Sequence, residues 1–175
     1  MIDESIEVKA SQILHRLAAN ISPPIPIEDI ARSYGAAIAR NHFSGTESGF
    51  ALRQGSQIII GVNTATSLRR QRFTIAHELG HLELHSNRII VDHSVFVARR
   101  DEVSSLGTDY QEVQANRFAA AILMPKDLVL SELQNLLALG DFQSRDELIA
   151  KMARGFDVSN EAMGYRLINL NAISA

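Results

Sequence analysis

The pattern H-E-x-x-H at residues 77–81 restricts the possible structures of this chain more than any other sequence feature. On a helix, His77 and His81 lie about one turn apart on the same face, so both imidazoles can bind one metal ion. Glu78 then points to one side of that pair, where its carboxylate can reach a water molecule without binding the metal. The pattern therefore predicts a helix that carries two zinc ligands and a general base for hydrolysis.

The residues around this pattern favour a metal site over a chance match. Gly80 lies inside it, where glycine costs a helix about 1 kcal/mol relative to alanine. A glycine at this position indicates that another backbone or a substrate comes close to the helix. Apolar residues flank the pattern, as expected for a partly buried helix: Phe73, Ile75, Ala76, Leu79 and Leu82.

A catalytic zinc site has three protein ligands and one open position, so a third ligand is needed. His85 cannot bind the same ion as His77, because eight residues of helix separate them by about 12 Å. We interpret His85 as an outer residue that lines the cleft or interacts with the helix end. The third ligand must therefore come from another element of the chain.

Glu112 is the best candidate for the third ligand. It shares one helix face with Ala115, Asn116 and Ala119, and small alanines would let that helix pack closely on the helix of residues 77–81. Asn116 could orient a ligand side chain by a hydrogen bond without itself binding the metal. The alternative for Glu112 is a favourable charge at a helix N-terminus. Weaker candidates for the third ligand precede it: Asp92, His93, Asp101 and Glu102.

Composition excludes several other kinds of site. The chain has no cysteine, so disulfides, thiolate metal sites and cysteine nucleophiles are ruled out. Its net charge of −3 gives no indication of nucleic acid or of an anionic membrane as a partner. The N-terminus does not read as a signal peptide, and no apolar run approaches the ~18–20 residues of a membrane span. We expect a cytoplasmic protein.

Hydrophobic periodicity and turn residues predict an α+β fold with a small mixed or antiparallel sheet. Helices are expected over residues 3–20, 27–34, 66–85 or 67–85, 108–124, 127–139, 145–154 and 160–170. Strands are expected over residues 36–41, 49–53 and 57–62, the last two forming a hairpin around Gly55. The start at Thr108 rests on a capping-box pattern with Gln111. Residues 86–107 are expected to be irregular, with a short strand at 95–98 as an option.

Two parts are predicted: a metallopeptidase core at residues 1–126 and a helical subdomain packed on it at residues 127–175. Residues 144–170 read as a helix-turn-helix-like pair, with a Ser144–Glu147 capping box, Gly155 in the turn and Ser159 as the second cap. This segment carries as many acidic as basic residues, so it suits packing or partner docking better than DNA binding. The basic run of Arg69, Arg70 and Arg72 is expected to be a solvated helix face.

Residues 72–85 and 112–125 resemble the ImmA/IrrE family of metallopeptidases, and residues 25–35 and 99–109 are also similar to it. The resemblance implies a zincin-like fold of the glutamate-ligand type. One zinc ion would be bound by His77, His81 and Glu112, and Glu78 would be catalytic. Family members are often paired with a helix-turn-helix repressor, which some of them cleave, and others occur in toxin–antitoxin-like pairs.

We therefore expect a zinc-dependent intracellular endopeptidase that cleaves a specific regulatory protein, such as a helix-turn-helix repressor or an antitoxin. The alternative is a non-catalytic or toxin-like interaction module with a vestigial metal site. Glu78 favours catalysis, because a purely structural site has no use for it. By analogy with zincins, substrate would add to an edge strand near residues 49–62. Candidates for stabilising the oxyanion or contacting substrate are Tyr110, His93, Arg99 and Arg100.

Overall fold

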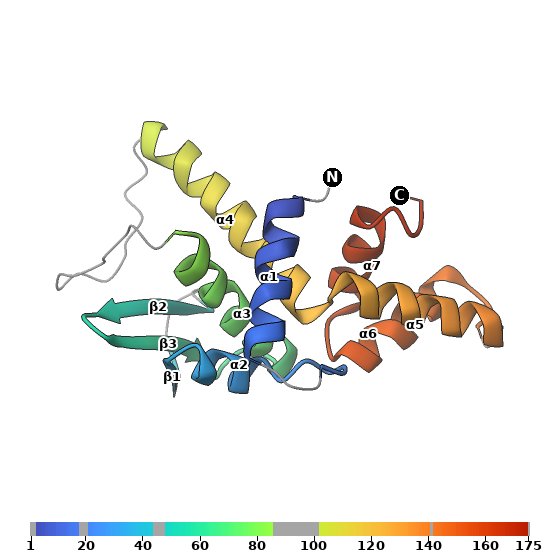
Figure 1. Ribbon diagram of the computed structural model, residues 1–175, viewed down its shortest axis with the longest axis horizontal. Helices are drawn as coiled ribbons and strands as arrows, with labels where there is room; N and C mark the ends of the chain where they lie inside the picture. Colours follow the sequence, from blue (N-terminus) through green and yellow to red (C-terminus); the bar gives the residue numbers. More distant parts are fainter. Residues whose placement is uncertain (1–2, 18–20, 44–47, 86–101, 141, 175) are drawn as a thin grey trace.

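The computed structural model describes residues 3–17, 21–43, 48–85, 102–140 and 142–174. Its elements, drawn in Figure 1, are α1 (Glu4–Leu17), α2 (Ile27–Ser33), β1 (Ala36–Asn41), β2 (Gly49–Gln54), β3 (Gln57–Asn63), α3 (Leu68–Leu84), α4 (Glu102–Leu123), α5 (Lys126–Leu139), α6 (Arg145–Phe156) and α7 (Asn160–Asn169). The predicted α+β class is confirmed. Within the described residues, no helix has the length and apolar character needed to cross a membrane.

The sheet has three strands in the order β1-β3-β2. β1 pairs with β3 in parallel, whereas β2 and β3 form an antiparallel hairpin that turns at Gly55, whose φ is +59°. The sheet is therefore mixed, and all three strands agree with their predicted ranges to within one residue. β2 is an edge strand, so among the described residues no strand pairs with one side of its backbone.

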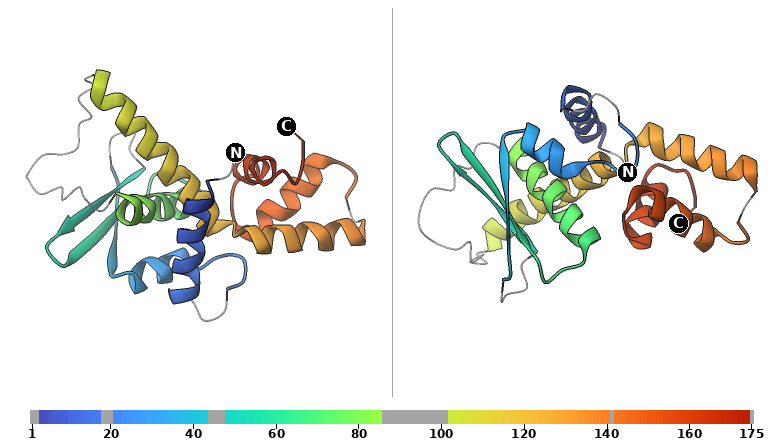
Figure 2. Two further views of the ribbon diagram at one scale, coloured as in Figure 1. Left: turned by 45° about the horizontal axis from the view of Figure 1, so that its top comes forward. Right: turned by 90° about the horizontal axis from the view of Figure 1, so that it is seen from below.

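Helix α3 lies against the sheet and against α4 (Figure 2). It begins where the Ser67 side chain accepts a hydrogen bond from the Arg70 N–H, one of the two predicted starts. A Cβ on Gly80 would lie 3.3 Å from Ala115 Cα and 3.1 Å from Phe118 Cδ1. The predicted close approach of another backbone is confirmed, and α4 is the element that makes it.

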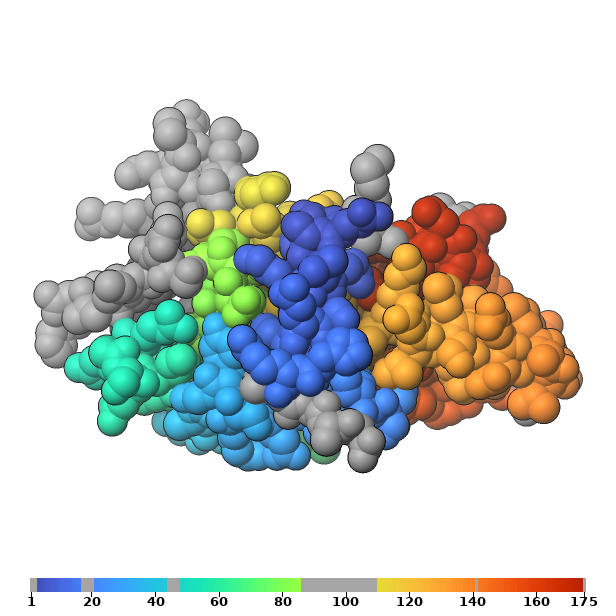
Figure 3. Space-filling model, viewed as in Figure 1, coloured from blue at the N-terminus to red at the C-terminus, as the bar shows by residue number. Residues whose placement is uncertain are grey.

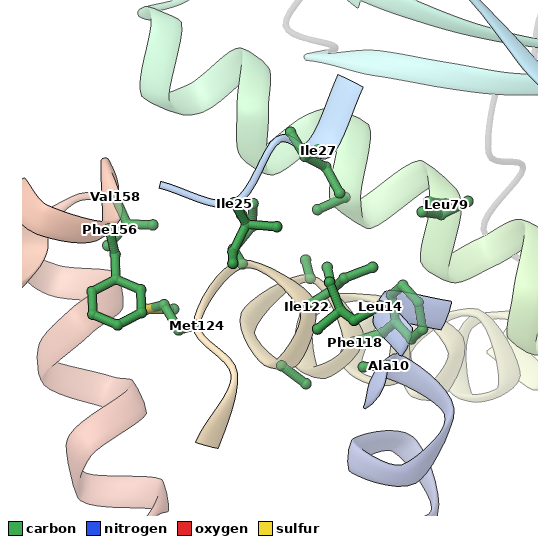
Figure 4. Close-up of a cluster of buried hydrophobic side chains, with 14 of the residues drawn as sticks. Ala10, Leu14, Ile25, Ile27, Leu79, Phe118, Ile122, Met124, Phe156 and Val158 are labelled. Atoms are coloured by element: carbon green, nitrogen blue, oxygen red, sulfur yellow. The ribbon is translucent and has the colours of Figure 1, made fainter. Parts of the chain in front are cut away.

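One cluster of buried hydrophobic side chains runs from α1 through α3 and α4 to α6 and α7 (Figure 4). Helix α1 packs against α4 and lies between α3 and α5 on the face seen in Figure 3. Arg166 of α7 is only 4% exposed; it donates to the Met124 carbonyl at 2.9 Å and pairs with both carboxylate oxygens of Glu7. These contacts join the C-terminal helices to the rest of the chain. The division of the chain into a core at residues 1–126 and a helical subdomain at residues 127–175 stays a prediction.

Three sequence predictions differ from the structure. Helix α4 begins at Glu102 rather than Thr108, because Gly107 weakens a helix without ending it. Gly155 lies inside α6, and Asp157 instead takes the left-handed conformation of the turn, with φ +51°. The basic run is not a purely solvated face: Arg69 and Arg72 both pair with Asp157. The optional strand at residues 95–98 lies outside the described residues.

Candidate metal centre

Two helices bring three potential metal ligands to one point. Nε2 of His77 and Nε2 of His81, one turn apart on α3, are 3.0 Å from each other. The Glu112 carboxylate on α4 faces both rings, with Oε2 3.1 Å from His77 Nε2 and Oε1 3.1 Å from His81 Nε2. Among the described residues, these three side chains form the group of histidine and carboxylate donors able to hold a metal ion.

The hydrogen bond of His77 determines which of its nitrogens is free. Its Nδ1 lies 3.0 Å from Oδ1 of Asn116, one turn beyond Glu112 on α4. An amide oxygen can only accept a hydrogen bond, so Nδ1 carries the proton. The Nε2 lone pair of His77 therefore points towards Glu112 and is available to a cation. Asn116 thus contacts the ring in the way an outer partner of a metal ligand does.

A longer hydrogen-bonded series fixes His81 in the same tautomer. His85 Nε2 lies 3.1 Å from Oε1 of Gln114, which can only accept, so that nitrogen of His85 carries a proton. His85 Nδ1 then accepts from His81 Nδ1 at 3.2 Å, which leaves the Nε2 of His81 unprotonated. Gln114 also donates to the hydroxyl of Tyr110 at 3.3 Å. The series leads from His81 to the solvent-exposed Tyr110.

The donor set fits a zinc ion in spacing and in chemistry. Two ligands bound tetrahedrally at ~2.0–2.1 Å are roughly 3.3 Å apart, close to the 3.0–3.1 Å separations here. Two imidazole lone pairs and a carboxylate converge without a proton between the two Nε2 atoms. Such a concentration of electron density is favourable when a cation neutralises it, and the two-histidine, one-glutamate set is an established catalytic zinc arrangement.

The electrostatics of the two histidines keep them ready to bind a metal. Burial lowers the pKa of His77 more strongly than the Glu112 charge raises it. Burial, followed by the neighbouring His77, lowers the pKa of His81 to about 4. Both rings are therefore neutral near pH 7, and metal binding needs no proton to be removed from them.

Glu78 connects the metal-motif helix to the edge strand. It follows His77 on α3, and its partly buried carboxylate accepts a hydrogen bond from the backbone N–H of Ala51 on β2. Burial, and next the charge of Glu112, raise the pKa of Glu78 to about 7, while the Ala51 N–H lowers it. A carboxylate with this pKa can both take up and release a proton at neutral pH.

The other predicted site residues have different outcomes. His85 and Asn116 contact the two metal-site histidines, and Tyr110, which is 60% exposed, is connected to His85 through Gln114. His93, Arg99 and Arg100 lie outside the described residues, as do Asp92, Asp101 and the side chain of Glu102. Sequence reasoning missed Gln114 and the Ala51 backbone. For Gln114, the available signal was its i, i+4 spacing from Tyr110, which places the two side chains next to each other on a helix.

Two known proteins are similar to this chain, one in sequence and one in fold. Over 111 residues, the chain is 32% identical to the radiation response metalloprotease IrrE of Deinococcus radiodurans. The aligned region covers 62% of this chain and 30% of that protein. A solved Mycobacterium tuberculosis transcriptional regulator has a similar fold, with a TM-score of 0.64 and 18% identity. That likeness covers 95% of this chain and 47% of the regulator. The chain thus spans less than half of either protein.

The family match covers most of the chain. The model of the Peptidase_M78 family, described as an IrrE N-terminal-like domain, matches residues 33–168. This range contains the sheet, both helices of the candidate metal centre and most of the C-terminal helices. The chain therefore belongs to the ImmA/IrrE family of metallopeptidases.

Proposed function

We propose that this protein is a zinc-dependent endopeptidase that acts inside the cell on a specific regulatory protein, such as a helix-turn-helix repressor or an antitoxin. The observation that carries the proposal is the convergence of His77, His81 and Glu112 on one point, with the carboxylate of Glu78 directly following His77 on α3 and interacting with the edge strand. The fold is then zincin-like, with His77, His81 and Glu112 as ligands of one zinc ion per chain.

Each residue of the centre has a role in peptide hydrolysis. Bound zinc would supply a Lewis acid that polarises the peptide carbonyl and makes water more acidic. The Glu78 carboxylate takes a proton from the attacking water and passes it to the leaving amine, a contribution typically worth ~10²–10⁴-fold in rate. Asn116 and His85 hold the two ligand rings in the tautomer that leaves Nε2 free.

The substrate backbone would lie along the free side of β2. This strand is at the edge of the sheet, and its Ala51 N–H already contacts Glu78. An extended peptide that adds to such an edge gains main-chain hydrogen bonds, and its scissile bond passes next to the general base. The similar Deinococcus radiodurans protein is named as a radiation response metalloprotease, which supports a peptidase that acts in a cellular response.

Metal content is the first test of the proposal. The wild-type protein should bind close to one zinc per chain in elemental analysis, and Glu112→Ala should lose most of it. Glu161→Ala, a change at an exposed glutamate on α7, serves as the control and should retain the metal. A folded wild-type protein that takes up no zinc would instead support the interaction-module alternative.

Proteolysis is tested separately. Cell lysate is incubated with the zinc-loaded wild type or with Glu78→Gln, and new protein N-termini are identified by mass spectrometry. Glu78→Gln keeps all three ligands, so it should bind zinc normally and produce none of the N-termini that the wild type produces. Equal sets of N-termini from the two proteins would contradict the catalytic role of Glu78.

A further inference from the structure

Arg70 differs from the two arginines that flank it on α3. Arg69 and Arg72 both pair with Asp157, at 3.1 Å and 3.4 Å, and so contribute to holding α3 against the C-terminal helices. Arg70 is exposed, and within the described part of the chain no carboxylate pairs with it. Its charge is therefore available to a group that comes from outside.

Neighbouring side chains connect Arg70 to the metal centre through the ring of Phe73. Its Nε donates to the hydroxyl of Ser48 at 3.0 Å, and its Cζ lies 5.9 Å from the centre of the Phe73 ring. The Phe73 ring is in turn 6.3 Å from the ring of His77.

The position of Arg70 along the edge strand sets its distance from the general base. Ser48 directly precedes β2, and Ala51, which donates to Glu78, lies three residues further on. At ~3.3 Å per residue, three strand residues span roughly 10 Å. A peptide lying along β2 would thus bring a side chain two or three residues from the scissile bond next to Arg70.

We infer that Arg70 is a specificity-determining residue that binds an aspartate or glutamate side chain of the substrate, two or three residues from the scissile bond on the Ser48 side. The inference rests on the proposed peptidase function. Because Ser48 takes Nε, the two Nη groups remain for a carboxylate, and such pairing is strong and directional. Ser48 and Phe73 hold the guanidinium in place before substrate arrives, which lowers the entropy lost on binding.

Peptide binding to an inactive protein tests this subsite without relying on turnover. Fluorescein-labelled decapeptides that differ only by Glu or Gln at one position, scanned along the peptide, are titrated against zinc-loaded Glu78→Gln, with fluorescence anisotropy as the readout. At one position the Glu peptide should bind about 5- to 30-fold more tightly than its Gln partner. Adding Arg70→Gln should abolish that preference, and adding Arg70→Glu should reverse it, so that the Gln peptide binds more tightly than the Glu peptide.

Arg69→Gln is the matched control, because it removes a neighbouring positive charge that pairs with Asp157 instead. It should keep the preference for Glu. The absence of any position favouring Glu, or a preference that survives in Arg70→Gln, overturns the inference. If the wild type cleaves peptides without a preference for an acidic residue, the Arg70 subsite is contradicted and the peptidase function is not. An Arg70-dependent preference in a wild type that cleaves nothing supports the subsite and contradicts the peptidase function.

Discussion

The backbone N–H of Ala51 donates a hydrogen bond to the carboxylate of Glu78, which joins the edge strand to the metal-motif helix. This bond lowers the pKa of Glu78, while burial and the charge of Glu112 raise it, and the balance lies at about 7. A general base works best when its pKa is near the working pH. The same strand that would hold a substrate backbone therefore also positions and tunes the base.

The raised pKa of Glu78 makes the metal-free protein less stable at high pH. In the unfolded chain this carboxyl ionises near 4.5, and in the folded chain near 7. Its contribution to stability is therefore complete below pH 4.5 and is lost as the pH rises through 7, at a cost on the order of 3 kcal/mol. We expect metal-free Glu78→Gln to be more stable than the wild type at pH 8, and the difference to vanish near pH 4.5.

Urea unfolding of both metal-free proteins at these two pH values measures the effect. Gln134→Ala, at an exposed position on α5 that carries no ionisable group, should change stability equally at both pH values. A Glu78→Gln protein that is less stable than the wild type at pH 8 would refute the destabilising ionisation of Glu78.

Asn116 should affect metal affinity through the orientation of His77. Asn116→Ala removes the acceptor 3.0 Å from His77 Nδ1, so the ring is free to rotate or change tautomer. Loss of such an outer partner typically costs 10–100-fold in metal affinity. Competition with a chromophoric zinc chelator should detect this loss, and Asn116→Asp, which keeps an acceptor oxygen, should restore most of the affinity. Equal zinc affinities for Asn116→Ala and the wild type would exclude the role.

The sequence was sufficient to predict the elements of the fold, because their signals are local. Strand ranges followed from apolar runs and from Gly55, and the start of α3 followed to within one residue from the pair Thr66 and Ser67. The start of α4 was misplaced because a capping-box pattern at Thr108 can also occur inside a helix. The pairing of Arg69 and Arg72 with Asp157 joins residues more than 80 positions apart, and no local pattern encodes it.

The candidate site was predictable to the extent that helical spacing encodes it. His77, Glu78 and His81 follow from one motif, and Glu112 and Asn116 follow from the face they share on the next helix. The Ala51 N–H could not be predicted, since a backbone group carries no side-chain signature and its position depends on how β2 packs on α3. That Arg70 has no carboxylate partner among the described residues likewise depends on which two of the three nearby arginines pair with Asp157.

Gly80 should control the distance between α3 and α4, and with it the metal centre. An alanine Cβ there would lie 3.1–3.3 Å from Phe118 and from the backbone of Ala115, so the helices must separate slightly. We expect Gly80→Ala to lower the free energy of unfolding by about 1–3 kcal/mol and to weaken zinc binding. Gly155→Ala is the control, because a Cβ on Gly155 meets nothing within 4 Å and alanine favours the helix. It should leave zinc affinity unchanged.

The pairing of Glu7 with Arg166 tests whether the N-terminal and C-terminal helices unfold together. Arg166 is 4% exposed, so Glu7→Gln would leave a buried guanidinium without its charge partner. Breaking such a pair typically costs 3–5 kcal/mol, whereas Glu4→Gln, on the exposed side of α1, should cost little. Because one hydrophobic cluster includes both regions, Glu7→Gln should lower a single urea midpoint, measured alike by far-ultraviolet circular dichroism and by tyrosine fluorescence. Two separate transitions, with only one of them shifted, would instead support independent folding of residues 1–126 and 127–175.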